Sequence, residues 1–463
     1  MAARTRYLGS SRLRPLDCLL VAALVILASL GGSVLQPTWR GLPFAGWIVV
    51  GAAVASWRIV VDPSRFPATL LGVALAPFAV ALVQLCPLPI GWLAFSDGQA
   101  LAAGVRALAV PMATASISVD RLATALATVP IAVFAVTLLL FHAQPQRTRN
   151  LVLLGFALLG GLSIILELVQ FLSGGRWGDF YHSAHAANAP GVFANRNHGA
   201  TFLACCLAFA GAWIGRGAIS LPRRQLWFTA AALPALTVVA LSGSRAGLLI
   251  GTAMALATLL AISADQARTG DAARPDKGFT RIPILLALAG FGLLIVLVPL
   301  NGGTAERLTA VSGDLRWSIW SHSRNLAMLY WPWGSGIGTF AEVYAPIEPV
   351  GELAPFYINH AHSDLLELFV EAGALAFVPL VALLLFVRAS LARPTAHRHE
   401  RLERRVGMIV ITGLFAHSCV DYPLRTPALA IVLALALGLL APAARPANSR
   451  GHEQGDITRP ARS

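Results

Sequence analysis

The sequence predicts an all-α polytopic integral membrane protein with about twelve transmembrane helices. Its 463 residues are 56% hydrophobic and only 12% charged, about half the charged share of a soluble domain. Apolar runs long enough to span a bilayer recur along the chain, and arginines gather in alternate connections between them. We therefore expect one transmembrane domain over residues 1–443 in preference to two or three soluble domains.

The apolar runs define the predicted helices, since a bilayer core needs about 20 mainly apolar residues per helix. Twelve runs occur, at 16–35, 43–60, 67–86, 121–141, 151–172, 198–214, 226–242, 246–263, 282–300, 365–387, 406–422 and 427–443. The first run follows four arginines and resembles a signal peptide. Because many spans follow it, we interpret it as a retained first helix. Residues 444–463 are expected to form a disordered cytoplasmic tail.

The distribution of basic residues predicts the orientation. With the N-terminus placed inside, the inside segments hold 25 of the 35 Lys and Arg residues, so both termini are predicted to be cytoplasmic. This topology explains the formal net charge of +13. We expect no nucleic-acid binding, because no Lys/Arg run is interleaved with stacking aromatic residues.

Two predicted outside segments are long. Residues 87–120 have the character of an interfacial stretch. Residues 301–364 form a large periplasmic loop between the ninth and tenth predicted helices, rich in Trp, Tyr and Phe. Such aromatic residues suit either a membrane interface or stacking against sugars, and both interpretations stay open here.

Three arginines on the outer face predict an anion-binding site. Arg196 lies just before the sixth span, Arg245 lies in the turn before the eighth, and Arg316 lies in the long loop before the tenth. The planar guanidinium can grip a phosphate with two parallel hydrogen bonds. The alternatives are that Arg245 only reaches towards the interface and that Arg196 and Arg316 are ordinary loop charges.

The same three spans all begin on the outer face, where each start carries candidate capping residues. A helix N-terminus presents free backbone N–H groups and a positive dipole end, which attract anions. The candidate caps are Asn195 or Asn197, Ser242 or Ser244, and Ser363 or Asp364.

Histidines and a carboxylate supply the remaining chemistry. His360 and His362 lie at the end of the long loop, and a histidine can accept a proton near neutral pH. His417 and Asp421 are four residues apart, which predicts one helical face and either a functional pair or a pair that braces the bundle. No HExxH motif and no zinc-type Cys/His spacing occurs, so we expect neither a metal site nor a cofactor.

Five motifs in order give the chain a resemblance to the O-antigen ligase and O-antigen polymerase superfamily of bacterial envelope glycan assembly, strongest over about 188–380. They are Gly191-Val192-Phe193-Ala194-Asn195-Arg196-Asn197-His198, Ser242-Gly243-Ser244-Arg245-Ala246-Gly247, Arg316-Trp317-x-x-Trp320, Pro332-Trp333-Gly334-Ser335-Gly336-Ile337-Gly338-Thr339-Phe340, and His360-Ala361-His362-Ser363-Asp364 running to Glu371-Ala372-Gly373. Ligases of this kind are similar in having His, then Asn, Ser or Gln, nine residues, and Gly-x-x-Gly. His362-Ser363 and Gly373 fit this pattern, whereas Ala376 replaces the second glycine.

The resemblance implies transfer of a glycan from undecaprenyl pyrophosphate to an acceptor hydroxyl on the periplasmic face. The acceptor would be lipid A-core, a growing polysaccharide or another glycan, and ligase and polymerase both stay open. We expect His362 to be the catalytic residue. We expect the substrate-binding residues to be Arg245, Arg316, Arg196, Asn197, His360 and Asp421. The alternatives are a transporter or flippase that binds a polyprenyl-linked glycan without chemistry, and a structural membrane subunit.

Overall fold

The structure is a computed structural model, and it describes residues 14–33, 40–109, 113–182, 188–217, 219–264, 315–352, 358–395 and 397–441. The predicted span at 282–300, the loop residues 301–314 and the predicted tail at 444–463 lie outside the described residues.

The described chain is almost entirely helical. The long helices are α1 (Pro15–Leu30), α2 (Gly41–Val61), α3 (Ala68–Leu85), α6 (Arg121–His142), α7 (Gln146–Leu172), α8 (Arg196–Gly215), α9 (Leu221–Leu241), α10 (Arg245–Ala264), α13 (Arg316–Leu329), α16 (Phe377–Ala392), α17 (Arg398–Ser418) and α18 (Pro427–Leu440). Shorter helices are α4 (Ile90–Leu93), α5 (Asp97–Ala109), α14 (Phe340–Tyr344) and α15 (Asp364–Ala372).

Eight of the described helices are long and apolar enough to cross a membrane, counting Asp364–Ala392 as one, and α1 and α18 are shorter apolar helices. This supports an all-α membrane protein, while the number twelve stays a prediction. The run expected at 406–422 belongs to α17, which begins in a charged segment at Arg398 and ends at Ser418. Asp421 therefore lies in the turn between α17 and α18 instead of on the helical face of His417.

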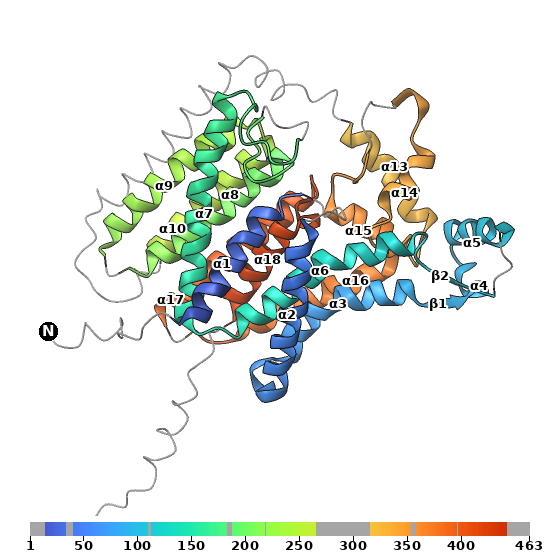
Figure 1. Cartoon of the computed structure of the whole chain (residues 1–463), viewed down its shortest axis with the longest axis horizontal. Helices are drawn as coiled ribbons and strands as arrows, with labels where there is room; N and C mark the ends of the chain where they lie inside the picture. The colour runs from blue at the N-terminus through green and yellow to red at the C-terminus, as the bar shows by residue number, and fades with distance from the viewer. Residues whose placement is uncertain are drawn as a thin grey trace, which may run out of the picture.

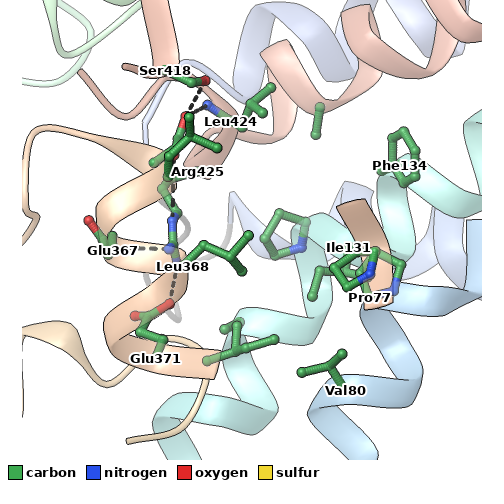
Figure 2. Close-up of a pocket in the computed structure, with 18 of the residues that line it drawn as sticks. Pro77, Val80, Ile131, Phe134, Glu367, Leu368, Glu371, Ser418, Leu424 and Arg425 are labelled. Atoms are coloured by element: carbon green, nitrogen blue, oxygen red, sulfur yellow. Dashed lines mark hydrogen bonds and ion pairs between the residues drawn. The ribbon is translucent and has the colours of Figure 1, made fainter. Parts of the chain in front are cut away.

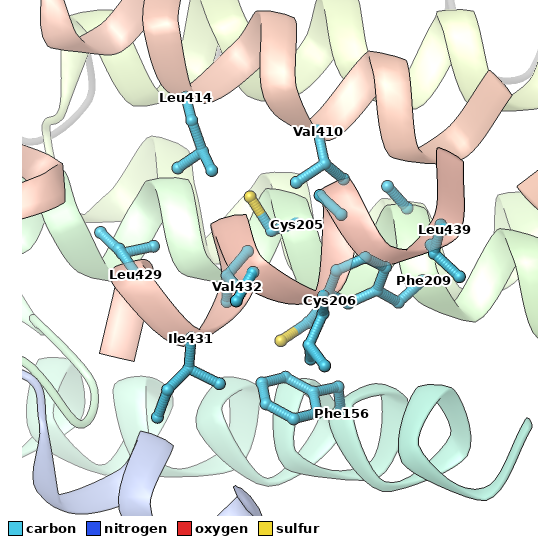
Figure 3. Packing of buried hydrophobic residues seen from close by; sticks show 14 of the residues in the cluster. Phe156, Cys205, Cys206, Phe209, Val410, Leu414, Leu429, Ile431, Val432 and Leu439 are labelled. Atoms are coloured by element: carbon cyan, nitrogen blue, oxygen red, sulfur yellow. The ribbon is translucent and has the colours of Figure 1, made fainter. Parts of the chain in front are cut away.

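The hydrophobic core surrounds α18, which is apolar and buried along its whole length. In Figure 1 it lies with α1 between a group formed by α7, α8, α9 and α10 and a second group formed by α3, α6 and α16. Figure 3 shows side chains of α7, α8, α17 and α18 packed together, with Cys205 and Cys206 buried among aliphatic and aromatic residues. Both cysteines are free thiols in this core, as their apolar surroundings predict.

The two ends of the helix bundle differ in charge. At one end, which we call the arginine-rich end, the fully buried Arg149 donates to the backbone carbonyls of His142, Gly438 and Ala441. Arg216 forms an ion pair there with Glu403 of α17. The other end, where α8, α10, α13 and α15 begin, contains the predicted functional residues, and we call it the site end.

A small subdomain at residues 87–117 packs against the site end. It contains α4, α5 and a two-stranded antiparallel sheet of β1 (Pro87–Pro89) and β2 (Thr114–Ser116), in which Leu88 pairs with Ala115. The buried amide of Gln99 on α5 donates to the carbonyls of Ile117 and Gly334. The subdomain therefore fixes one side of the Pro332–Phe340 segment, an arrangement that no pattern in the sequence indicated.

Candidate active site

The buried carboxylate of Asp421 joins four separate elements at the site end. Asn197, at the start of α8, donates from Nδ2 to Asp421 Oδ2 at 2.6 Å. Arg316, the first residue of α13, places its guanidinium 3.5 Å from the same oxygen. His362 Nδ1 lies 3.3 Å from Oδ1, and His198 Nε2 lies 3.8 Å from it. The structure thus brings together four of the predicted site residues and adds His198.

The backbone at His362 has an unusual conformation. Its φ of 50° lies in the left-handed region, which is uncommon for residues other than glycine. Trp320 Nε1 donates to the His362 carbonyl at 3.3 Å. The imidazole keeps 30% exposure, whereas the Asp421 side chain has none. One edge of the ring is thus held by Asp421 and part of it stays accessible.

The charge on Asp421 is stabilised by its neighbours. Burial alone would raise the pKa of this carboxyl, but the imidazoles of His198 and His362 outweigh burial and hold the pKa well below its usual range. The backbone N–H of Tyr422 donates to Oδ1 at 3.0 Å. Asp421 is therefore an anion that orients donors around it.

Tyr422 forms an aromatic centre beside this carboxylate, and the sequence reasoning missed it. Its ring stacks on His360 with centroids 4.1 Å apart, and it meets His362 and His198 edge-on at 5.2 Å and 4.8 Å. Burial and the neighbouring Asp421 raise the pKa of its hydroxyl, so it stays neutral. Three histidines from α8 and the 358–363 segment are thus ordered around one ring.

The predicted helix caps are present. Asn195 accepts from the Asn197 N–H at the start of α8, and Ser363 accepts from Leu366 N–H at the start of α15. Ser244 accepts from Gly247 N–H at 3.1 Å in the first turn of α10. In each predicted pair of candidates, one residue fills the capping role.

Arg196 and Arg245 lie at this end as the first residues of α8 and α10. The two helix starts are adjacent, because a Cβ added to Gly247 would lie 2.5 Å from the Cβ of Ala200. Arg245 is exposed and Arg196 is partly buried. Both arginines therefore lie at the site end of the bundle by position in their helices.

A second polar cluster lies behind the first. Arg425, between α17 and α18, is surrounded by three carboxylates from one face of α15, those of Asp364, Glu367 and Glu371 (Figure 2). The closest contact is a 2.8 Å hydrogen bond from Arg425 to Glu371. These carboxylates raise the pKa of the Arg425 guanidinium against the opposing effect of burial. His360, predicted as a substrate-binding residue, contacts Glu367 at 2.9 Å and belongs to this cluster.

A cavity of about 460 Å³ adjoins this second cluster. Its polar wall contains His360, Asp364, Glu367, Glu371 and Arg425, and the rest of its lining is mainly apolar. Figure 2 shows apolar side chains such as Leu368, Ile131, Pro77 and Val80 between α15 and the helices α3 and α6. The arrangement offers an apolar chamber directly beside the histidine segment.

The glycine-rich motif at 332–340 is in close backbone contact with the C-terminal end of α15. A Cβ on Gly334 would lie 2.2 Å from the Glu371 carbonyl oxygen, and one on Gly373 would lie 2.3 Å from the Pro332 carbonyl oxygen. Both glycines have positive φ. Ala376, which stands where ligases have a second glycine, is fully buried beside Val80 and Ala372, so its methyl group fits.

Across the part of the chain that the structure describes, no group of three or more His, Cys, Asp or Glu side chains is arranged to hold a metal ion. In comparisons with known proteins, residues 230–381 match a family model described as O-Antigen ligase. This range includes Arg245, Arg316 and His362, whereas Asn197, His198 and Asp421 lie outside it. No curated protein and no solved structure matches the chain.

Proposed function

We propose that the protein belongs to the O-antigen ligase and polymerase superfamily and transfers a glycan from undecaprenyl pyrophosphate to an acceptor hydroxyl. The match of residues 230–381 to a family model described as O-Antigen ligase supports this proposal. The acceptor is lipid A-core, a growing polysaccharide or another glycan. The reaction inverts the anomeric centre and needs no metal. It takes place on the periplasmic face of the bacterial inner membrane, within a bundle of about twelve spans.

The observation that carries this proposal is the attachment of His362 and Arg316 to one buried carboxylate. With Asp421 accepting from the Nδ1 side of His362, the Nε2 lone pair is available as a general base. The Arg316 guanidinium lies 3.5 Å from the other oxygen of the same carboxylate. The proposed base and the proposed phosphate-binding cation thus share one buried carboxylate.

In the proposed step one proton is transferred, one bond to the anomeric carbon forms and another breaks. The acceptor hydroxyl gives its proton to His362 Nε2 while its oxygen forms a bond to the anomeric carbon of the donor sugar. The bond from that carbon to the pyrophosphate oxygen breaks, and its electron pair leaves with the pyrophosphate. Arg316, Arg245, Arg196 and the N–H groups at the starts of α8 and α10 stabilise the developing negative charge. Asp421, which has no exposed side-chain surface, orients His362 instead of touching the substrate.

The cavity behind the histidines supports a lipid-linked donor. Its apolar walls suit an isoprenoid chain. Its polar wall holds three carboxylates around Arg425, so it repels a pyrophosphate and favours placing that group on the Arg316 side.

The test is transfer by purified protein, with a polyprenyl-pyrophosphate glycan as donor and a chelator in the buffer. His362→Ala should slow transfer by about 10²–10⁴-fold, the usual contribution of a general base, with donor binding nearly unchanged. Arg316→Ala should abolish transfer, and Arg316→Lys should restore little of it, because lysine lacks the planar fork. Arg324→Ala on the same helix α13 is the matched control.

Normal turnover by His362→Ala would end its catalytic role. If the wild-type protein binds the donor but yields no product with any acceptor, the transporter or flippase interpretation replaces the enzyme. A structural subunit would tolerate every one of these substitutions.

A further inference from the structure

The two residues that precede His362 both contact one carboxylate, that of Glu367 on the first turn of α15. Glu367 Oε2 accepts from the backbone N–H of Ala361 at 2.9 Å, and Oε1 lies 2.9 Å from His360 Nδ1. Both contacts fall on the two residues that precede His362. The Glu367 side chain is almost completely buried, with 1% exposure.

Arg425 fixes this carboxylate from the other side. Its NH2 group lies 3.4 Å from Glu367 Oε1, and its NH1 group donates to Glu371 at 2.8 Å (Figure 2). A buried carboxylate without a cation would be strongly disfavoured, so Arg425 allows Glu367 to stay charged and to accept from Ala361 and His360 together. The contacts therefore run from Arg425 through Glu367 to the residues immediately before His362.

The residues after His362 are tied to the same turn that carries Asp421. Asp364 N–H donates to the Asp421 carbonyl at 3.1 Å, and Ser363 Oγ donates to the Ser418 carbonyl at 3.2 Å. His362 thus sits between two anchored stretches. Its left-handed φ of 50° is unfavourable for a histidine and persists because both flanks are fixed.

We propose that Glu367, held by Arg425, is a positioning residue that fixes the 360–362 turn and keeps His362 against Asp421. The inference rests on the proposed function, since it assigns Glu367 a role only through the general base. Glu367 acts on His362 through Ala361 and His360 and takes no part in bond making.

The experiment is a double-mutant cycle in the purified transfer assay with a polyprenyl-pyrophosphate glycan donor. Glu367→Gln should lower kcat by about 10²-fold, the effect of misplacing a catalytic group by about 1 Å, and should leave donor binding unchanged. In the His362→Ala background the same substitution should cause no further loss, because its only path to the reaction is gone. Glu342→Gln, an exposed carboxylate on α14, is the matched control and should match wild type.

Arg425→Lys gives a second route if Glu367→Gln does not insert into the membrane. It keeps a cation beside Glu367 but loses the fork, so it should show a smaller kcat loss that also vanishes in the His362→Ala background. The proposal is overturned if either variant keeps wild-type kcat, or if its loss is the same with and without His362. Normal turnover by His362→Ala alone would instead remove the proposed function, so the two failures are distinguishable.

Discussion

Asp421 carries its charge with no exposed side-chain surface, so neighbouring groups must replace the hydrogen bonds of water. The Asn197 amide, the His362 imidazole and the Tyr422 backbone N–H do so by donating to it. The Arg316 guanidinium lies 3.5 Å from the carboxylate and the His198 imidazole 3.8 Å from it. A carboxylate satisfied in this way fixes the directions of its donors and favours the Nδ1–H tautomer of His362. We therefore propose that its chemical role is orientation, which an uncharged replacement would fulfil poorly.

Asp421→Asn tests this role. The asparagine amide keeps the size of the side chain but removes the anion that selects the His362 tautomer and neutralises Arg316. We expect transfer to fall by about 10²–10⁴-fold, with the protein still folded, because the general base loses its correct protonation. Initial rates and donor affinity measured side by side would check this, with the exposed Asp97→Asn as control. A variant that loses donor binding and keeps its turnover rate would point to a substrate-binding role instead.

Single residues were predictable where a polar side chain stood out in apolar sequence. Asp421 was identified on that basis, and Arg316 and His362 were identified from motifs in the long outside loop, but their common contact depends on tertiary packing. Tyr422 was missed because an aromatic residue near a span end normally indicates an interface. Arg425 had a usable signal: Asp364, Glu367 and Glu371 follow helical spacing within an otherwise apolar run, and such a buried acidic face requires a cation.

At the scale of elements, apolar run length predicted helices well, because backbone groups in a bilayer must be satisfied within a helix. The end of α17 was misplaced because its apolar residues continue past Ser418 into the turn. The subdomain at 87–117 was not predicted, since its strands are three residues each and its position depends on side-chain hydrogen bonds such as those of Gln99 to Ile117 and Gly334 and of Trp333 to Trp92.

The close packing of Gly373, at the end of α15, against Gly334 leads to a prediction about stability. Gly373→Ala should lower the free energy of unfolding by about 1–3 kcal/mol, because its positive φ is strained for alanine and the added methyl group would meet the Pro332 carbonyl. The thermal unfolding midpoint in detergent would measure this. Gly351→Ala, where nothing lies within 4 Å of the added carbon, is the matched control and should leave the midpoint unchanged. Equal midpoints for both variants would contradict the packing role of Gly373.

At the scale of the whole molecule, α17 separates the two ends of the bundle. It has 21 residues, so it is about 30 Å long, close to the thickness of a bilayer core. The end of α10 lies at its arginine-rich end, where Arg405 NH1 donates to the Ala261 carbonyl at 3.3 Å. The start of α13 lies at the opposite end, where Arg316 contacts Asp421. The end of α10 and the start of α13, which flank the predicted span at 282–300 in the sequence, therefore lie at opposite ends of the helix bundle. A membrane span between them would require this arrangement.

Reporter fusions provide the test of this topology. We predict that residue 270 lies in the cytoplasm and residue 350 in the periplasm, for two reasons. The basic residues favour an arginine-rich cytoplasmic side, and the site end lies at the other end of α17. A fusion at 270 should be active only with a cytoplasmic reporter, and a fusion at 350 only with a periplasmic one. If both fusions report the same side of the membrane, the prediction of a span at 282–300 is wrong. Reversed results would place the site end in the cytoplasm, where a periplasmic acceptor could not reach His362.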